Sequence, residues 1–256
     1  MNIVYTKIPK TASTYYCRLI EENYSKENGL KIYIPGSEGW RDPKVPIFPN
    51  ISNGEDDRYK NVIGKYNISA RHLSQHKPFF DKIMDGPIKY VTTLRNPLNR
   101  MLSHYYCNYI GTRSRYGNEE RDFNRWYSEN YEKLNPKDYN QMNTMLPLGF
   151  DNLMSYMLDY QNEDELTVES VKNKLDLILL TEKTEDSKKL LSKFLGIKDI
   201  TQGPYQNKRE RKNPNPNYKN FKIDNSVLDL FMDNNKMDYK LYEISLDIFN
   251  QQISEL

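Results

Sequence analysis

The chain has 256 residues, of which 37% are hydrophobic and 28% are charged, and its formal net charge is +2 at pH 7. This length and composition describe a folded, polar protein with a substantial core, and an aromatic content of 12% argues against disorder. The near-neutral charge argues against wholesale nucleic-acid binding, which usually requires a larger basic excess.

Apolar runs and turn residues predict alternating strands and helices in the first part of the chain. The clearest strand, Ile88–Leu94, is rich in β-branched and aromatic residues and is bounded by Gly86-Pro87 and by Arg95-Asn-Pro97. The elements predicted here are, in order, a strand at Asn2–Thr6, a helix at Thr11–Tyr24, an irregular excursion at about 35–60, a strand at Tyr66–Ala70, a helix at Pro78–Met84 and the strand Ile88–Leu94.

The second part of the chain is predicted to be mainly helical, with one more buried strand. Its elements are helices at Leu98–Ile110, Asn118–Tyr131, Asp151–Tyr160 and Glu163–Lys174, a strand at Leu175–Leu180, a helix at Glu185–Leu195, a basic loop at about 203–222, and helices at Asn225–Asn234 and Lys236–Ile253. Strands separated by helices are typical of βαβ units. We therefore expect one α/β domain over 1–256, with a parallel sheet flanked by helices.

The sparse cysteines and histidines limit the chemistry that the chain can perform. Cys17 and Cys107 form neither a disulfide framework nor a metal-binding pattern, and the histidines do not cluster with them, so structural zinc is not expected. No apolar run approaches the ~18 residues of a membrane span, and the N-terminus enters a strand without a signal peptide. We expect a cytoplasmic protein without an integral membrane segment.

The ends of three predicted strands carry polar residues. Lys7–Lys10 follows the first strand, Arg95 follows Ile88–Leu94, and Thr181-Glu182 follows Leu175–Leu180. In parallel sheets ligands bind beyond the carboxyl ends of the strands. We therefore expect these residues to meet at one ligand site.

The segment Lys7–Thr14, with the sequence KIPKTAST, has the strand–loop–helix context of an anion-binding loop. Backbone N–H groups and the helix dipole attract an anion there, Lys10 adds a full charge, and hydroxyl groups add donors. The loop is not a Walker A motif, because no glycine occurs before Gly29. The alternative is an ordinary strand-to-helix turn with a Ser or Thr cap.

A second anion-binding element is predicted at Arg95–Ser103. Arg95 follows a strand, and Ser103 lies eight positions later, about two turns along the next helix. A guanidinium group and a hydroxyl so placed could hold a phosphate. Alternatively, Arg95 caps a loop and Ser103 faces solvent.

Lys7–Thr14 together with Tyr90–Tyr106, whose sequence is YVTTLRNPLNRMLSHYY, resembles the membrane-type carbohydrate sulfotransferases, and most closely the uronyl and heparan sulfate 2-O-sulfotransferases. The resemblance implies a P-loop-like sulfotransferase fold and the donor PAPS (3′-phosphoadenosine 5′-phosphosulfate), whose product is 3′,5′-ADP, without a metal. It also assigns the 5′-phosphosulfate to Lys10, Thr11, Ala12, Ser13 and Thr14, and the 3′-phosphate to Arg95 and Ser103.

Two further segments are similar to this family. Leu179–Glu185 looks like its strand followed by Thr-Glu. A basic loop falls where the family closes a positively charged flap over the nucleotide, with Lys208, Arg209, Arg211 and Lys212. Asn96 departs from the family, which usually has Asp there, and the excursion at about 35–60 has no counterpart, so the acceptor stays open.

Sulfuryl transfer requires a base for the acceptor hydroxyl and a cation for the leaving group. The resemblance implies His72 as the base and Lys10 as the cation. His76 is interpreted as a solvated helix cap, and His104 is interpreted as a packing residue. The residues proposed to contact an acidic acceptor are Lys7, Arg18 and Arg71.

The expected function is transfer of a sulfuryl group from PAPS to a hydroxyl of a carbohydrate or another acceptor. One alternative is an atypical nucleotide-dependent phosphotransferase, which would require ATP and Mg²⁺. Another is a nucleotide- or glycan-binding protein without turnover. Since the eukaryotic relatives are anchored in the Golgi, the chain is expected to be either a cytoplasmic enzyme or an excised catalytic domain. The oligomeric state stays open.

Overall fold

The computed structural model describes residues 2–20, 23–24, 32–33, 68–71, 75, 77, 80–81, 84–107, 122–137, 141, 150–197, 200 and 222–256. The irregular excursion predicted at about 35–60 lies outside these residues. The same holds for His72, His76, Lys208, Arg209, Arg211 and Lys212.

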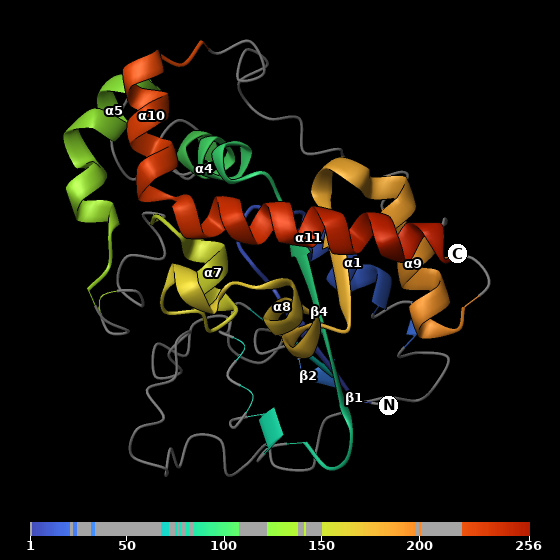
Figure 1. Ribbon diagram of the computed structural model, residues 1–256. Helices are drawn as coiled ribbons and strands as arrows, with labels where there is room; N and C mark the ends of the chain where they lie inside the picture. The colour runs from blue at the N-terminus through green and yellow to red at the C-terminus, as the bar shows by residue number, and fades with distance from the viewer. Residues whose placement is uncertain are drawn as a thin grey trace.

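Five parallel strands form one sheet in the order β2-β3-β1-β4-β5 (Figure 1). The prediction of a parallel α/β sheet is therefore confirmed. One strand, β2, was not predicted, because two residues are too short to show a periodic pattern. The strands are β1 at Asn2–Thr6, β2 at Ile32–Tyr33, β3 at Ile68–Arg71, β4 at Ile88–Leu94 and β5 at Leu177–Leu180.

The strand register brings the carboxyl ends of the central strands to one edge. Thr6 of β1 is level with Arg71 of β3 and with Thr92 of β4, while Leu94 of β4 is level with Leu180 of β5. All residues of β1 and β5 are buried. Strands covered on both faces are expected to be apolar throughout, and this explains why they lack an alternating pattern.

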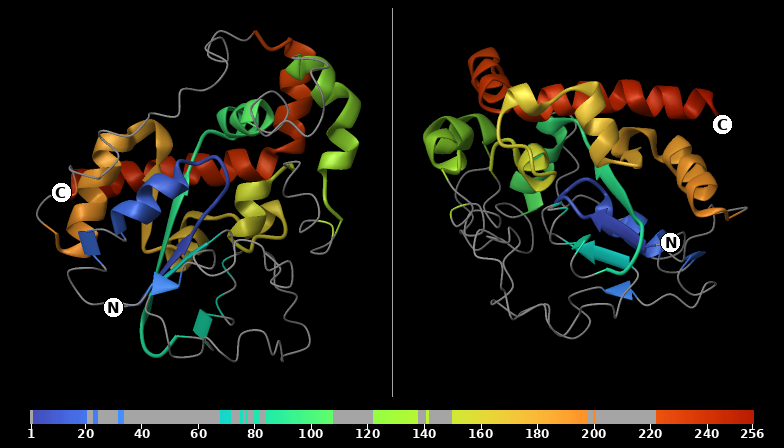
Figure 2. Two further views of the ribbon diagram at one scale, coloured as in Figure 1. Left: turned by 180° about the vertical axis from the view of Figure 1, so that it is seen from behind. Right: turned by 60° about the horizontal axis from the view of Figure 1, so that its bottom comes forward.

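Helices lie on both faces of the sheet. The last helix, α11, crosses one face and packs against β5, α8 and α9, while α1 lies on the other face (Figures 1 and 2). The helical elements are α1 at Ser13–Ile20, α4 at Pro97–Tyr105, α5 at Phe123–Asn130, η4 at Tyr131–Leu134, α7 at Leu153–Met157, η5 at Glu163–Glu165, α8 at Val168–Lys174, η6 at Thr181–Lys183, α9 at Thr184–Leu195, α10 at Asn225–Asn234 and α11 at Lys236–Ser254.

Most predicted helices have a counterpart among the described elements, whereas the helix predicted at Pro78–Met84 lies mostly outside the described residues. The helix predicted at Asp151–Tyr160 is shorter, because α7 covers only Leu153–Met157. The predicted helix Glu163–Lys174 is divided into η5 and α8, because Thr167 caps α8 by accepting a hydrogen bond from the Ser170 N–H group. The two C-terminal helices agree with the prediction to within one residue. Among the described helices, none combines the length and the apolar character needed to cross a membrane.

The buried side chains form two clusters. The larger contains residues of β1, β4, β5, α1, α7, α9 and α11. The smaller joins α4, α5 and α10 through edge-to-face or stacked rings, including those of Tyr105, Phe123, Tyr127 and Phe231. The helix that follows β4 is therefore packed by a core of its own.

Candidate functional site

The strand order reverses its direction between β1 and β4. From β1 the chain proceeds to β2 and β3 on one side of the sheet, whereas β4 and β5 lie on the other side. In open α/β sheets ligands bind outside the carboxyl ends of the strands at such a reversal. Both predicted anion-binding elements begin there, one directly after β1 and the other directly after β4.

The loop after β1 is shaped by two left-handed residues and two inward-facing hydroxyl groups. Lys10 has a φ of 68° and Ala12 a φ of 56°, conformations that are usual for glycine. The hydroxyl groups of Thr11 and Ser13 are buried and donate to the Ile8 carbonyl at 2.9 and 2.7 Å. In this arrangement these two hydroxyl groups stabilise the loop rather than face outward.

Lys10, Ala12 and Thr14 are the more accessible members of the predicted loop site. Lys10 is half-buried, and Ala12 and Thr14 are exposed. Within the described part of the chain, the Lys10 side chain forms no ion pair.

Arg95 connects the two predicted elements directly. Its Nη1 atom donates to the Lys10 carbonyl oxygen at 3.1 Å, and the side chain is half-buried. This contact places the guanidinium group of the second element against the loop of the first. The structure thus brings Lys10 and Arg95 together, as the position of the strand ends predicts.

Helix α4 begins immediately after Arg95. Asn96 is its N-cap and accepts a hydrogen bond from the Asn99 N–H group at 3.2 Å, and Pro97 occupies the first helical turn. Asn96 therefore supplies the side-chain cap of α4. Ser103 is half-buried on α4, and the neighbouring His104 is buried.

The end of β5 completes the same edge. The Thr181 hydroxyl donates to the Leu94 carbonyl at 3.1 Å, and Oε1 of Glu182 accepts from the Asn96 N–H group at 3.0 Å. Oε2 of Glu182 accepts from the hydroxyl of Tyr242 on α11 at 3.1 Å. Burial, followed by the nearby Glu182 carboxylate, raises the pKa of Tyr242.

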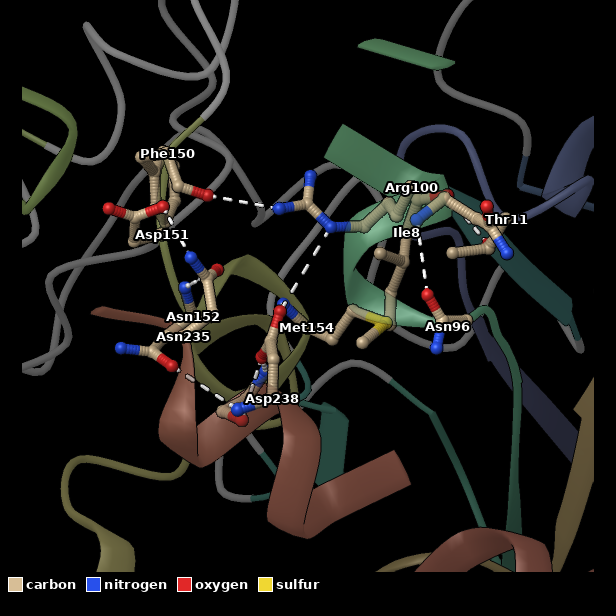
Figure 3. Close-up of polar contacts among 12 residues, drawn as sticks. Ile8, Thr11, Asn96, Arg100, Phe150, Asp151, Asn152, Met154, Asn235 and Asp238 are labelled. Atoms are coloured by element: carbon tan, nitrogen blue, oxygen red, sulfur yellow. Dashed lines mark hydrogen bonds and ion pairs between the residues drawn. The ribbon is translucent and has the colours of Figure 1, made fainter. Parts of the chain in front are cut away.

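A buried charged network behind α4 was not predicted from the sequence (Figure 3). Arg100 is fully buried; its Nη2 donates to the Phe150 carbonyl at 3.1 Å, and its Nε lies 4.0 Å from Oδ2 of Asp238. Burial lowers the pKa of Arg100, and the carboxylates of Asp238 and Asp151 oppose that shift. An arginine within a helical pattern looks the same in the sequence whether it is exposed or buried.

Asp238 also joins two helix N-termini. Its carboxylate accepts from the N–H groups of Met154 and Ser155 at 3.1 and 2.8 Å, which caps α7. In return, Oδ1 of Asn152 accepts from the Asp238 N–H group at 3.2 Å, and Oδ1 of Asn235 accepts from the Asn152 N–H group at 3.1 Å. The two helices therefore cap each other beside Arg100.

The residues predicted to contact an acceptor are only partly brought to this edge. Lys7 is half-buried directly after β1, and Arg71 ends β3 level with Thr6. Arg18 is exposed in the last turn of α1, so it lies beyond the loop that contains Lys10. Among the described residues, no group of three or more histidine, cysteine or acidic side chains could hold a metal ion.

Comparison with known proteins gives two matches. A family model described as the sulfotransferase family matches residues 1–245. The heparan sulfate 2-O-sulfotransferase hst-2 of Caenorhabditis elegans is 34% identical over 139 residues, which cover 49% of this chain and 40% of that protein. The match therefore spans less than half of the length of this relative.

Proposed function

The chain belongs to the sulfotransferase family, and on this premise we propose that it transfers a sulfuryl group from PAPS to a hydroxyl of a carbohydrate acceptor. The observation that carries the proposal is the contact between Arg95 and the Lys10 carbonyl at the reversal between β1 and β4. It brings together two cationic elements that could hold two separate phosphates of one nucleotide.

The residues around this contact fit a doubly phosphorylated donor. The loop at Lys7–Thr14 supplies Lys10 and a helix start for the 5′-phosphosulfate. Arg95, with Ser103 further along α4, supplies a guanidinium group and a hydroxyl for the 3′-phosphate. The predicted basic residues 208–212 would add charge over the same nucleotide.

The proposed reaction is an in-line displacement at sulfur. The oxygen of the acceptor hydroxyl forms a bond to sulfur, the bond from sulfur to the bridging oxygen breaks, and 3′,5′-ADP leaves. Negative charge develops on that bridging oxygen, and the ammonium group of Lys10 would offset it. The proton of the acceptor hydroxyl passes to His72.

The strand register supports His72 as the base. Strand β3 ends at Arg71, which is level with Thr6 at the end of β1, and His72 is the next residue in the sequence. Gln75 is buried beside the end of β1: its Oε1 accepts from the Thr6 hydroxyl at 3.4 Å, and its N–H group donates to the Met157 carbonyl at 2.6 Å.

A carbohydrate acceptor is supported by the partial match to a heparan sulfate 2-O-sulfotransferase. Heparan sulfate is a polyanion, and an anionic sugar would require cations beside the reacting hydroxyl. We assign this role to Lys7 and Arg71. Lys7 directly follows β1, and Arg71 is the last residue of the neighbouring strand β3.

The proposal can be tested by measuring the thermal unfolding of the protein with 3′,5′-ADP, 5′-AMP and ATP–Mg²⁺ in parallel. A site for two separate phosphates should be stabilised most by 3′,5′-ADP, by about 2.7 kcal/mol at a hundredfold excess over its dissociation constant. Stabilisation by ATP–Mg²⁺ alone would instead indicate a phosphotransferase. Tight binding of 3′,5′-ADP without turnover of PAPS on any hydroxylated sugar would indicate a binding protein.

A further inference from the structure

We propose that Glu182 is a positioning residue for the second anion-binding element, so that preference for a ligand with a 3′-phosphate depends on its carboxylate. This inference rests on the proposed function, since it concerns the phosphate assigned to Arg95. Glu182 lies on η6, which directly follows β5. In this proposal it positions Arg95 and does not contact the ligand.

The Glu182 carboxylate bridges two helices. One oxygen accepts from the N–H group of Asn96 at the start of α4, and the other accepts from the hydroxyl of Tyr242 on α11. The distances of 3.0 and 3.1 Å are those of ordinary hydrogen bonds. Each oxygen thus has a different partner, and rotation of the carboxylate would break both bonds.

These bonds fix the backbone on both sides of Arg95. The Leu94 carbonyl accepts from the Thr181 hydroxyl, and the Asn96 N–H group donates to Glu182. The Arg95 side chain itself donates to the Lys10 carbonyl. Thr181 and Glu182 of η6 therefore fix the main chain around Arg95 in the absence of a ligand. Such preorganisation lowers the free-energy cost of binding.

The negative charge of Glu182 allows the direction of the change in ligand affinity to test the proposal. A carboxylate beside an anion-binding arginine repels an anionic ligand, so its removal would strengthen binding if it acted through charge alone. If it acts by holding Asn96 and Arg95, its removal weakens binding. The two possibilities therefore predict opposite changes in affinity.

The experiment is calorimetric titration of 3′,5′-ADP and 5′-AMP into the full chain and its variants. Glu182→Ala should weaken 3′,5′-ADP binding on the order of tenfold, as expected for loss of a charge-assisted hydrogen bond, and leave 5′-AMP binding within about twofold. Glu182→Gln retains an acceptor for the Asn96 N–H group and should restore most of the difference. Lys10→Ala is the matched control, because it should weaken both ligands.

A double variant tests whether Glu182 acts through Arg95. Arg95→Ala should remove the preference for 3′,5′-ADP, and Glu182→Ala should have no further effect on the preference in that background. If Glu182→Ala does not fold, Tyr242→Phe, which removes only one of the two bonds to the carboxylate, should still reduce 3′,5′-ADP affinity selectively.

Three outcomes would overturn the proposal: unchanged or tighter 3′,5′-ADP binding by Glu182→Ala, an equal loss for both ligands, or additive losses with Arg95→Ala. The wild-type chain provides the separate test of the proposed function. If it shows no preference for 3′,5′-ADP over 5′-AMP, the proposed function fails along with the inference, whereas a wild-type preference that Glu182→Ala retains refutes the inference alone.

Discussion

Lys10 and Arg95 meet through a main-chain oxygen and not through an acidic side chain. The Arg95 guanidinium group donates to the Lys10 carbonyl, and among the described residues neither side chain forms an ion pair. Two basic residues therefore meet at one edge of the sheet with no ion-pair partner in the part of the chain that the structure describes. Such an arrangement attracts an anion that carries more than one charge.

At the same scale, the base assignment predicts the effect of a single substitution. His72→Ala should abolish sulfuryl transfer while 3′,5′-ADP affinity stays within about twofold, because a base contributes roughly a hundredfold or more to the rate and does not hold the nucleotide. The measurements are the turnover of PAPS and the titration of 3′,5′-ADP. His76→Ala is the control and should retain activity; retained activity in His72→Ala would move the base to another residue.

Asp151 predicts a dependence of stability on pH. Burial raises its pKa from 3.8 to about 7, although hydrogen bonds from Asn235 and Tyr127 and the charge of Arg100 act in the opposite direction. The folded state therefore binds this proton more tightly, and the contribution to stability is present below about pH 4 and is lost as the pH rises towards 7.

The expected result is that Asp151→Asn flattens the decline in the free energy of unfolding between pH 4 and 7, by at most about 1.4 kcal/mol per pH unit. Asparagine keeps an oxygen that can accept from Asn235 and Tyr127, so the fold should persist. Denaturant unfolding at several pH values measures the difference. Identical profiles for the variant and the wild type would show that Asp151 does not carry the proton.

At the scale of the elements, the loop after β1 obtains its shape without glycine. Lys10 and Ala12 adopt left-handed conformations that cost about 1 kcal/mol or more for a residue with a Cβ atom. Ala12→Gly should therefore raise the free energy of unfolding by up to about 1 kcal/mol, and Ala12→Val should lower it. Chemical denaturation checks both; destabilisation by glycine would contradict the loop geometry.

The mutual cap of α7 and α11 predicts a larger effect. Asp238→Ala removes the acceptor of the Met154 and Ser155 N–H groups and leaves Arg100 buried without its carboxylate. Loss of one partner of a buried ion pair costs about 3–5 kcal/mol. Asp247→Ala, at an exposed position of the same helix, should change stability by less than about 0.5 kcal/mol. Similar unfolding midpoints for the two variants would contradict this role.

The sequence predicts the sheet and the meeting of its strand ends better than the side-chain contacts that support them. Strands β1, β4 and β5 are short apolar runs followed by polar residues, a pattern that local chemistry determines, and their meeting follows from parallel order. The Arg100–Asp238 pair and the Glu182–Tyr242 bond join residues far apart in the chain. Tertiary packing creates those contacts, and no local pattern indicates them.

For the molecule as a whole, α11 connects the site to the C-terminal half of the chain. Asp238 and Tyr242 lie one turn apart on this helix. Asp238 reaches Arg100 of α4 (Figure 3), and Tyr242 reaches Asn96 at the start of α4 through Glu182. The helix that follows Arg95 and carries Ser103 is therefore held by α11 at two points. We expect the site to be largely formed before the donor binds.

The most direct measurement is a crystal structure of the chain with 3′,5′-ADP. We predict that the 5′-phosphate lies in the loop at Lys7–Thr14, within reach of Lys10, and that the 3′-phosphate contacts Arg95 and Ser103 beyond the ends of β1 and β4. A nucleotide bound at another edge of the sheet, or one with its 3′-phosphate away from Arg95, would contradict the account.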